Sequence, residues 1–299
     1  MDKEYFPSHY APYKILILAA LTPIHVGEGR GEGVVDLVVQ KDPIFEIPKP
    51  RGTSIKGSIK NMLRNLGEKV EDILGSDPER TPTIPGKVMI LDAKLLLFPV
   101  RSSQGLFNYV TSTWTIQELN SLAKIVDVEL PIIDEDSKVI YATKKFKEGI
   151  IYFFNGELSY EIKIDNKVDK LAQRLKEKLR GILSPYLLSR IDYLLLANHE
   201  VFAEIVNAGL IRVARIRIDP TTKTVEEGAL FYQELVPEYS VFYSYILKTP
   251  RAKQNIDNIM KKLCHQITVI GGDETVGRGL VKLGLLDVEG GDACKTEKS

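Results

Sequence analysis

The pattern of apolar and polar positions along the chain predicts strands and helices in an irregular order. Residues 14–21 (KILILAAL) form a nearly continuous apolar run, which is typical of a strand covered on both faces. Further strand patterns occur at residues 88–100, 149–164, 210–219, 225–235, 241–248 and 280–288. Because these strands alternate unevenly with helical segments, the order favours an α+β fold over a doubly wound parallel sheet.

A helix is expected over residues 54–66, with Thr53 or Ser54 as its N-cap. Its apolar face consists of Ile55, Ile59, Met62, Leu63 and Leu66. A separate basic stripe at i, i+4 and i+8 consists of Lys56, Lys60 and Arg64. One face of this helix therefore packs, while the other stays available to an anion.

The middle of the chain carries most of the remaining helical pattern, mainly at residues 167–208. No repeat or low-complexity linker divides the chain. We therefore expect a single domain over residues 1–288, with a largely helical insertion at about 115–208. The polar segment EGGDACKTEKS at 289–299 is expected to be a disordered tail.

Composition adds limits on function and compartment. The chain has 40 basic and 40 acidic residues, so any contact with nucleic acid must come from a local patch. Cys264 and Cys294 lie far apart and the second is in the tail, so we expect neither a disulfide framework nor a zinc site. The apolar run at 15–21 is too short to span a membrane or to serve as a signal peptide, which favours a cytoplasmic protein without membrane contact.

Two glycine-rich segments are the strongest local features. A loop at residues 22–39 contains GEGRGEG, and the segment GGDETVGRG at 271–279 lies between two strand patterns. The second segment imitates a phosphate-binding Walker loop, but Arg278 and Gly279 replace its lysine and hydroxyl residue. The acidic pair Asp273 and Glu274 would also repel a triphosphate, which argues against a nucleotide hydrolase. A hairpin whose glycines only satisfy positive φ angles is the remaining alternative.

The segments PRGTSIKGSIKNMLR and IGGDETVGRGLVKL together resemble the RAMP superfamily of CRISPR proteins, and more narrowly the type III-B (Cmr) backbone subunits numbered four. The likeness continues through residues 22–36, 98–112, 214–219 and 241–253. It implies an RRM-like (ferredoxin-like) core with a thumb-like element. It also implies that the core holds guide RNA, and that copies of the chain stack into a helical filament beside other Cmr subunits.

The resemblance also assigns RNA contacts to particular residues. These are Arg51, Thr53, Ser54, Lys56, Gly57, Arg101, Ser102, Gly271, Gly272, Gly277, Arg278 and Gly279. Free N–H groups at a helix N-terminus attract a phosphate, and Lys56 adds a point charge there. Without the resemblance, Lys56 reads as a solvated surface lysine and Arg278 as a salt-bridge partner of Asp273 or Glu274.

Asp36, which closes the first glycine-rich loop, looks like the aspartate on which the family's metal-dependent cleavage of target RNA depends. A loop carboxylate can hold Mg²⁺ or Mn²⁺ near the scissile phosphate, or help to activate the ribose 2′-OH. The alternative without a functional role is that Asp36 is a solvated turn residue or a cap. His25 either pairs with Asp36 in acid–base chemistry or stacks on a base or braces the loop, and Glu234 is a weaker carboxylate candidate.

The expected function is that of a guide-binding backbone subunit. Within the assembled complex, it would act as a metal-dependent endonuclease on single-stranded target RNA paired with the guide, cutting at regular intervals. Two alternatives remain open at this point. One is a non-catalytic structural subunit that only binds guide RNA, and the other is a RAMP endonuclease that processes guide precursors.

Overall fold

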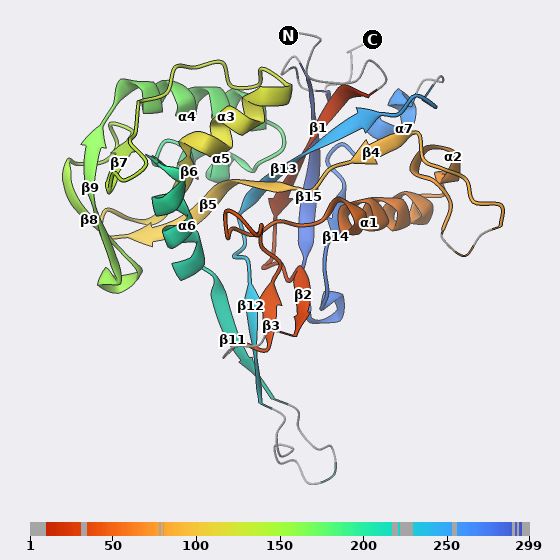
Figure 1. The fold of residues 1–299 in the computed structure, drawn as a ribbon, viewed down its shortest axis with the longest axis horizontal. Coiled ribbons are helices and arrows are strands. Elements are labelled where there is room, and N and C mark those ends of the chain that lie inside the picture. Colours follow the sequence, from red (N-terminus) through yellow and green to blue (C-terminus); the bar gives the residue numbers. More distant parts are fainter. Residues whose placement is uncertain are drawn as a thin grey trace.

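The computed structural model describes residues 10–30, 35–77, 79, 81–216, 221, 230–252, 256–288, 291, 293 and 294. Within these residues, eleven strands form one sheet and four form another (Figure 1). The mixture of strands and helices confirms the predicted α+β class. No helix among the described residues is long and apolar enough to cross a membrane.

The first half of the large sheet is antiparallel throughout. Across this half, the strands are β14 (Ile267–Val269), β15 (Leu280–Asp287), β1 (Ala11–Ala20), β13 (Val241–Lys248) and β5 (Lys94–Ser102), with β4 (Val88–Ile90) also paired to β13. In the register of β1, Ile17 lies opposite Tyr243 on one side and Gly284 on the other. The strand β1 is thus central, as its apolar run predicted.

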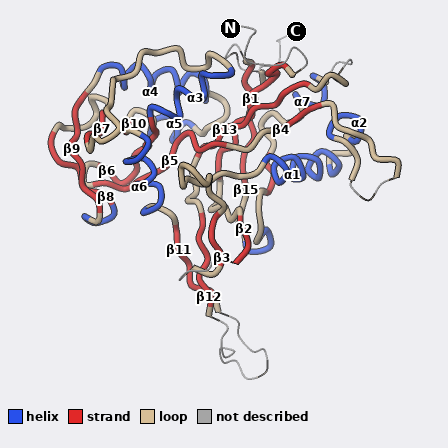
Figure 2. Tube along the Cα trace, viewed as in Figure 1, coloured by secondary structure: helices blue, strands red, loops and turns tan. Residues whose placement is uncertain are grey.

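Helices cover both faces of this half of the sheet. Leu16 and Leu18 of β1 pack with residues of α1 (Gly52–Asn65) and α7 (Asp257–Lys261). The alternate residues Ile15 and Ile17 pack instead with α3 (Thr113–Leu122), α4 (Asn166–Leu179) and α5 (Pro185–Arg190). In Figure 2, α3, α4 and α5 gather over one end of the molecule, and α1 lies toward the other with the short helix α2 (Glu71–Leu74). Burial on both faces explains why β1 lacks the alternation of a half-exposed strand.

The second half of the sheet curls and closes on itself. Its strands after β5 are β6 (Gly105–Ser112), β10 (Leu194–Ala197), β7 (Val139–Ala142), β9 (Leu158–Ile164) and β8 (Gly149–Phe153). The last strand, β8, pairs back with β5 where Phe153 lies opposite Ser102. A short 3₁₀ helix, η1 (Phe154–Gly156), follows β8 at this closure.

The prediction of a largely helical region at about 115–208 is therefore wrong. The helices α3, α4, α5 and α6 (His199–Ala208) are present there, but β7, β8, β9 and β10 lie between them. Residues 149–164 do form strands, as their pattern indicated. Two strands of this region were missed, β7 and β10, and all four residues of β10 (LLLA) are buried. A short, fully apolar run has no periodicity that separates a buried strand from a buried helix.

The smaller sheet projects from the large one at the bottom of Figure 1. Its order is β11 (Ile211–Arg215), β12 (Phe231–Leu235), β3 (Leu37–Val39) and β2 (Gly27–Arg30). The expected glycine-rich loop at 22–39 is thus partly a β2–β3 pair, and its residues 31–34 lie outside the described part. The strand predicted at 225–235 is observed for 231–235, and residues 225–229 also lie outside.

Helix α1 confirms the predicted helix but begins earlier, at Gly52, and its N-cap is Arg51 rather than Thr53 or Ser54. The Gly52 N–H donates instead to Asp92 Oδ1 at 2.8 Å. Asp92 is forty positions away in the sequence. The local cap pattern could not reveal this partner.

The cysteines also depart from expectation, because Cys264 and Cys294 form a disulfide. Cys264 follows α7, and Cys294 lies in the tail segment that was expected to be disordered. The Ala293 N–H donates to Leu285 O on β15, and the Ala293 side chain is buried. This part of the tail is therefore packed against the large sheet.

Candidate nucleic-acid interface

Of the three basic residues on α1, Lys56 is the one without an ion pair in the described part of the chain. Lys60 Nζ lies 2.7 Å from Asp77 Oδ1, and Arg64 Nη2 lies 2.7 Å from Asp77 Oδ2. Arg64 also binds Glu71. The hydrogen bonds from Arg64 and then Lys60 lower the pKa of Asp77 to about 2. The stripe predicted from the sequence is thus mostly neutralised within the protein.

Lys56 is half-buried, and burial, followed by the charge of Lys60, lowers its pKa. A partly desolvated ammonium group beside a like charge gains free energy when an anion approaches it. Its neighbours Thr53, Ser54 and Gly57 are exposed, and a Cβ placed on Gly57 would have no other atom within 4 Å. This part of the predicted patch is therefore open. Gly52 is different, since a Cβ there would lie 2.2 Å from Ile90 O, so its close approach is to the protein itself.

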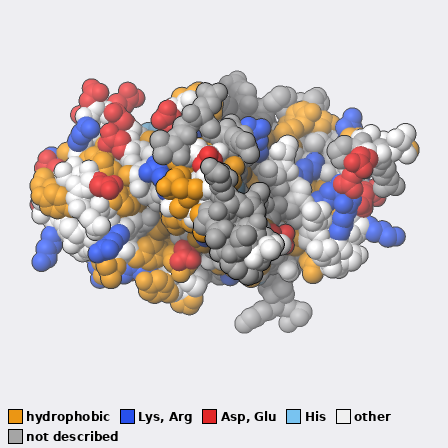
Figure 3. All heavy atoms as spheres, turned by 90° about the horizontal axis from the view of Figure 1, so that it is seen from below, with side chains coloured by type: hydrophobic (Ala, Val, Ile, Leu, Met, Phe, Trp, Pro, Cys, Tyr) orange, Lys and Arg blue, Asp and Glu red, His pale blue; other side chains and the backbone are white. Residues whose placement is uncertain are grey.

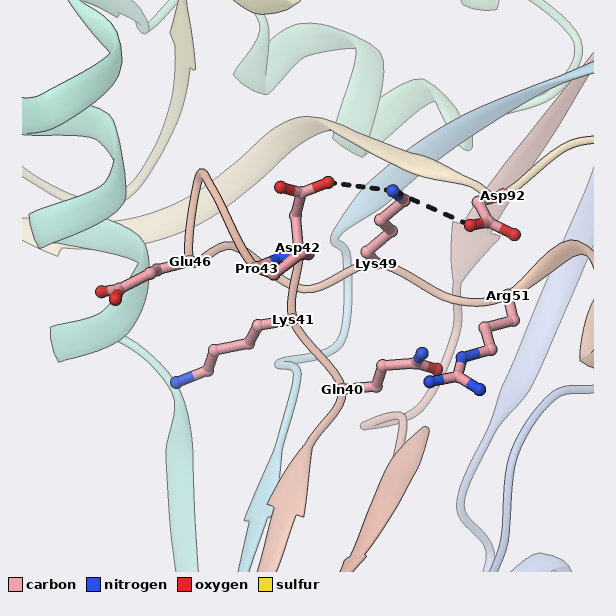
Figure 4. Close-up of a pocket in the computed structure, with 8 residues that line it drawn as sticks. All are labelled: Gln40, Lys41, Asp42, Pro43, Glu46, Lys49, Arg51 and Asp92. Carbon is pink, nitrogen blue, oxygen red and sulfur yellow. Dashed lines mark hydrogen bonds and ion pairs between the residues drawn. The ribbon is translucent and has the colours of Figure 1, made fainter.

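Arg51 lies at the rim of a polar hollow of about 580 Å³ (Figure 4), which is also lined by Gln40, Lys41, Asp42, Pro43, Glu46, Lys49 and Asp92. When the Gln40 amide is turned so that its oxygen faces the guanidinium, it accepts from Arg51 Nη2 at 2.8 Å. Across the hollow, Lys49 Nζ lies 2.9 Å from Asp42 Oδ2 and 3.8 Å from Asp92 Oδ2. The hydrogen bond to Asp42 raises the pKa of Lys49 despite its burial. With its lysines matched by carboxylates, the hollow is less suited to a phosphate than the face of Lys56.

The glycine-rich segment 271–279 packs directly on the first glycine-rich loop. The Gly272 N–H donates to His25 O at 3.0 Å, and the Gly279 N–H donates to Pro23 O at 2.9 Å. A Cβ on Gly271 would lie 2.1 Å from His25 O, and one on Gly279 would lie 2.3 Å from Ile270 O. Both residues have positive φ, so they are needed for packing and backbone conformation.

Gly272 and Gly277 have more space. A Cβ on Gly277 would have no neighbour within 4 Å, and one on Gly272 would only approach the His25 ring at 3.9 Å. Gly277 nevertheless has φ +78° at the end of the 3₁₀ helix η2 (Glu274–Val276). The segment therefore forms the turn that its glycines alone would predict, and Gly272 and Gly277 also lie on an exposed surface.

Asp273 connects this segment to the small sheet. Its Oδ2 accepts from Arg215 Nη1 of β11 at 3.0 Å and also from the Gln233 amide of β12. Burial by itself would raise the pKa of Asp273, but the hydrogen bonds from Gln233 and Arg215 outweigh it and the pKa is lowered. Among the described residues, Arg278 makes no ion pair with Asp273 or Glu274. Its guanidinium is thus left for another ligand.

The Asp273 interaction should make the protein more stable at neutral pH than at low pH. Because the folded-state pKa lies below the ordinary value near 3.9, the contribution is complete above that value and is lost as pH falls through the folded pKa. Asp273→Asn should lower the free energy of unfolding by about 1 kcal/mol at pH 7. Urea titrations between pH 7 and pH 3 should show the two proteins converging at the acidic end. A difference that does not change with pH would contradict this account.

Asp36 is exposed at the start of β3, and its Oδ2 accepts from the Tyr232 N–H of β12 at 2.7 Å. The described residues contain no cluster of three or more His, Cys, Asp or Glu side chains able to hold a metal ion. Asp36 nevertheless fits the role of a single oxygen ligand, because Mg²⁺ is often held by one or two carboxylates together with substrate phosphates. Any such site would be completed by RNA and water.

His25 does not lie beside Asp36. It is 8% exposed, its Nδ1 lies 2.9 Å from Glu234 O, and its carbonyl binds the glycine segment. The two side chains contact different backbone groups of β12: Asp36 Oδ2 accepts from the Tyr232 N–H, whereas the His25 ring lies beside the Glu234 carbonyl two residues further on. This position agrees with the expectation that His25 braces the loop, and it does not assemble an acid–base pair.

Glu234 is 3% exposed and is held by cations on both sides. Its Oε2 lies 3.5 Å from Lys41 Nζ, and its Oε1 lies 3.6 Å from Arg212 Nη2. This carboxylate thus joins β12 to its neighbours. Gln233 and Tyr232 are the contributions that sequence reasoning missed, although the alternation in FYQEL at 231–235 places successive side chains on opposite faces.

Arg101 and Ser102 lie apart from the residues described so far. They end β5 at the point where the curled half of the sheet closes, on the opposite side of the small sheet from α1 (Figure 1). Arg101 is exposed, and Ser102 Oγ accepts from Asn108 Nδ2 at 2.9 Å. The predicted RNA-binding residues therefore form two groups rather than one continuous patch.

Comparisons with known proteins all lead to one family. The RAMP superfamily model matches residues 17–282. The "CRISPR system Cmr endoribonuclease Cmr4" of Pyrococcus furiosus is 34% identical over 295 residues, covering 91% of this chain and 95% of the relative. The "CRISPR system CMR subunit Cmr4" of Saccharolobus solfataricus is 28% identical, covering 92% and 97%. A chain in a cryo-EM structure of the type III-B Cmr-beta complex in its apo state has a TM-score of 0.71 at 24% identity, covering 94% of this chain and 99% of that one.

Proposed function

The chain belongs to the RAMP superfamily and, within it, to the Cmr4 family, and from this premise we propose that it is a guide-RNA-binding backbone subunit of a type III-B CRISPR effector complex. In that complex it also cuts single-stranded target RNA paired with the guide. The observation that carries the RNA-binding role is Lys56, a half-buried cation without an ion pair in the described residues, at the start of α1. The relative from Pyrococcus furiosus is named an endoribonuclease, which supports the cutting role.

The fold supports a ferredoxin-like core of the RRM type. Along the chain, β1 is followed by α1 and then by β4 and β5, while β13 is followed by α7 and then by β15. In the sheet, β1 lies between β15 and β13, and β13 lies next to β5. This is the order of a split β-α-β-β-α-β unit. The projecting small sheet is the corresponding thumb-like element.

The guide runs across the start of α1, where Lys56 and the exposed residues Thr53, Ser54 and Gly57 meet its phosphates. Arg51, Arg278, Gly272 and Gly277 add contacts at the margins of this surface. Contacts of this kind recognise the backbone rather than the bases, so any guide sequence is accepted.

Replacing Lys56 with glutamine should weaken guide binding roughly tenfold at physiological salt, because one charge-assisted phosphate contact is lost. The slope of log K against log salt should become shallower by about 0.7, the value for one contact to a single strand. Fluorescence titrations at several salt concentrations measure both quantities. Lys124→Gln, at an exposed lysine just after α3, is the matched control and should change neither. An unchanged slope for Lys56→Gln would remove Lys56 from the interface.

Asp36 carries the chemistry. When bound, Mg²⁺ or Mn²⁺ supplies positive charge that stabilises the scissile phosphate in the transition state. Asp36 contributes one carboxylate oxygen, and its hydrogen bond from the Tyr232 N–H fixes the direction of that group. If Asp36 instead takes the proton of the ribose 2′-OH, the products carry a 2′,3′-cyclic phosphate and a 5′-hydroxyl. A 2′,3′-cyclic phosphate among the product ends would identify the ribose 2′-OH as the nucleophile.

Reconstitution tests the proposal as a whole. The chain is assembled with guide RNA and the other Cmr subunits, and labelled matched target is added with Mg²⁺ or Mn²⁺. Since each copy in a filament presents one Asp36, cuts should recur at a regular spacing. Target binding without any cutting would favour a purely structural subunit. Specific cutting of a guide precursor by the isolated chain would favour guide processing instead.

A further inference from the structure

The closure of the curled sheet leaves a hollow at the surface where β8 meets β5. The Ser103 N–H donates to Tyr152 O at 2.8 Å, and the Tyr152 N–H donates to Ser103 Oγ at 3.1 Å. Beside these bonds lies a hollow of about 350 Å³, lined by Arg101 and Ser102 from β5, by Tyr152, and by Phe154 and Asn155. We call this the seam site. The Tyr152 side chain is 50% exposed, so a large aromatic ring lies open to solvent here.

The lining of the seam site carries one cation, Arg101, and no carboxylate. The nearby turn before β8 carries Lys144, Lys145 and Lys147, which are exposed like Arg101, and none of these four residues makes an ion pair with the other described residues. The Gln104 side chain bonds the main chain of Lys147 twice, at 2.9 and 2.8 Å, which holds this lysine segment beside the β5–β6 turn. In Figure 3, the left part of the molecule, which carries β8 and β9 in Figure 1, shows blue and orange side chains with red ones among them.

Few carboxylates offset these cations. In the segments that form the seam, the exposed acidic residues are Glu148 and Glu157. Glu148 is held at the end of β9, because its Oε1 accepts from the Ile164 N–H at 3.1 Å. The lining of the seam site thus presents a cation and no carboxylate, which favours an anionic ligand.

The backbone of the seam site is held in an unusual conformation. Phe154 has φ 48° and Asn155 has φ 61°. Asparagine adopts such a conformation readily, but for phenylalanine it is unfavourable and persists only where the surroundings impose it. The Phe154 ring packs against Gly209, where a Cβ would lie 2.9 Å from its Cζ. Gly209 ends α6 two residues before β11, so the hollow is joined to the base of the small sheet.

We propose that the seam site binds a nucleotide of single-stranded RNA, with its base stacked on Tyr152 and its phosphate bound by Arg101. An open aromatic ring beside unpaired cations is the combination by which proteins hold single strands without reading their sequence. The proposal rests on the proposed function, since it requires that this chain handles RNA. It adds a second contact region on the side of the small sheet opposite to α1, so that one strand is held on both sides of that sheet.

A short uridine oligonucleotide and the full chain provide the first test. Tyr152→Ala should weaken binding roughly tenfold through loss of base stacking, with an unchanged salt slope. Tyr152→Phe keeps the ring and should bind as the unmodified protein does. Arg101→Gln should make the salt slope shallower by about 0.7, the signature of one phosphate contact. Tyr186→Ala, at a tyrosine of α5 that is 61% exposed, is the matched control and should have no effect.

Three outcomes would overturn the seam site. In the first, the affinity of Tyr152→Ala for the oligonucleotide is within twofold of that of the unmodified chain, while Lys56→Gln binds more weakly. This result would overturn the seam site and leave the proposed function intact. Another is a change in oligomeric mass of Tyr152→Ala without RNA, because the exposed side chains of Leu106 and Ile150 on the same edge would then belong to a protein contact. If neither the unmodified chain nor the assembled complex binds RNA, the proposed function itself fails.

Crosslinking identifies which strand occupies the site. In assembled complexes, 4-thiouridine is placed either in the guide or in the target, and the crosslinked peptides are sequenced. A crosslink within residues 149–156 from either strand supports the seam site and names the strand. The absence of such crosslinks from both strands, when Lys56-containing peptides are labelled by the guide, would overturn it.

Discussion

Replacing Asp36 with alanine is expected to abolish cutting of guide-paired target RNA while leaving guide and target binding unchanged. The reduction in single-turnover rate should be about 10²–10⁴-fold, the usual range for loss of a group that handles a proton or orients a metal-bound reactant. The side chain is exposed and makes one hydrogen bond, to the Tyr232 N–H, so the fold should tolerate its removal. Rates are measured with labelled target, and binding is measured by filter retention on the same complexes.

Asp36→Asn is the matched variant. It keeps an oxygen that can accept from the Tyr232 N–H but removes the negative charge. If Asp36 acts through its charge, both variants should be inactive, and if it is a metal ligand, higher Mn²⁺ should partly restore Asp36→Asn. Full activity of Asp36→Asn would show that only the hydrogen bond matters. Regular cuts at an undiminished rate in Asp36→Ala would remove this residue from the mechanism.

The second large effect is expected for stability, at Gly271. A Cβ at this position would lie 2.1 Å from His25 O, and φ is +88°, so alanine has both a steric clash and an unfavourable backbone. Gly271→Ala should lower the free energy of unfolding by roughly 2–5 kcal/mol. Urea unfolding followed by circular dichroism provides the measurement.

Gly277→Ala separates the two causes. Gly277 has φ +78°, but its Cβ would have no neighbour within 4 Å, so only the backbone cost of about 1–2 kcal/mol should appear. Equal losses at the two positions would contradict the packing of Gly271 on His25. Because Gly277 faces open space, its substitution also tests whether the guide approaches this backbone. If the Gly277→Ala protein binds guide RNA more weakly than the Asp273→Asn protein does, the difference would support a direct contact between the guide and the backbone at Gly277.

Local patterns were sufficient where a residue's role depends on its own neighbours in the chain. The apolar run at 14–21 predicted a strand buried on both faces, and β1 is that strand. The spacing of Ile55, Ile59 and Leu63 predicted α1, because a helix brings residues three and four apart onto one face. The paired motifs at the two ends of the chain likewise indicated the RAMP family, which the comparisons bear out.

Local patterns could not predict the contacts between segments that are far apart in the sequence. Asp92 accepts from the Gly52 N–H at the start of α1, and Asp273 pairs with Arg215 rather than with the nearby Arg278. His25 and Asp36 belong to one short glycine-rich stretch, yet the pairing of β2 with β3 separates them. Sheet order and register decide these distances, and neither is visible in the periodicity of a single segment.

The sequence alone therefore determined the α+β class, the central strand, the first helix and the family, because each rests on periodicity or on motifs contiguous in the chain. Only the tertiary structure decided which basic side chains are paired with carboxylates within the protein. Lys60 and Arg64 share a stripe with Lys56, but residues 71 and 77 fold back to neutralise them. The same holds for the seam site, since closing the sheet is what brings Tyr152 of β8 beside Arg101 of β5. Charge and ring are local properties, whereas their juxtaposition depends on the path of the whole chain.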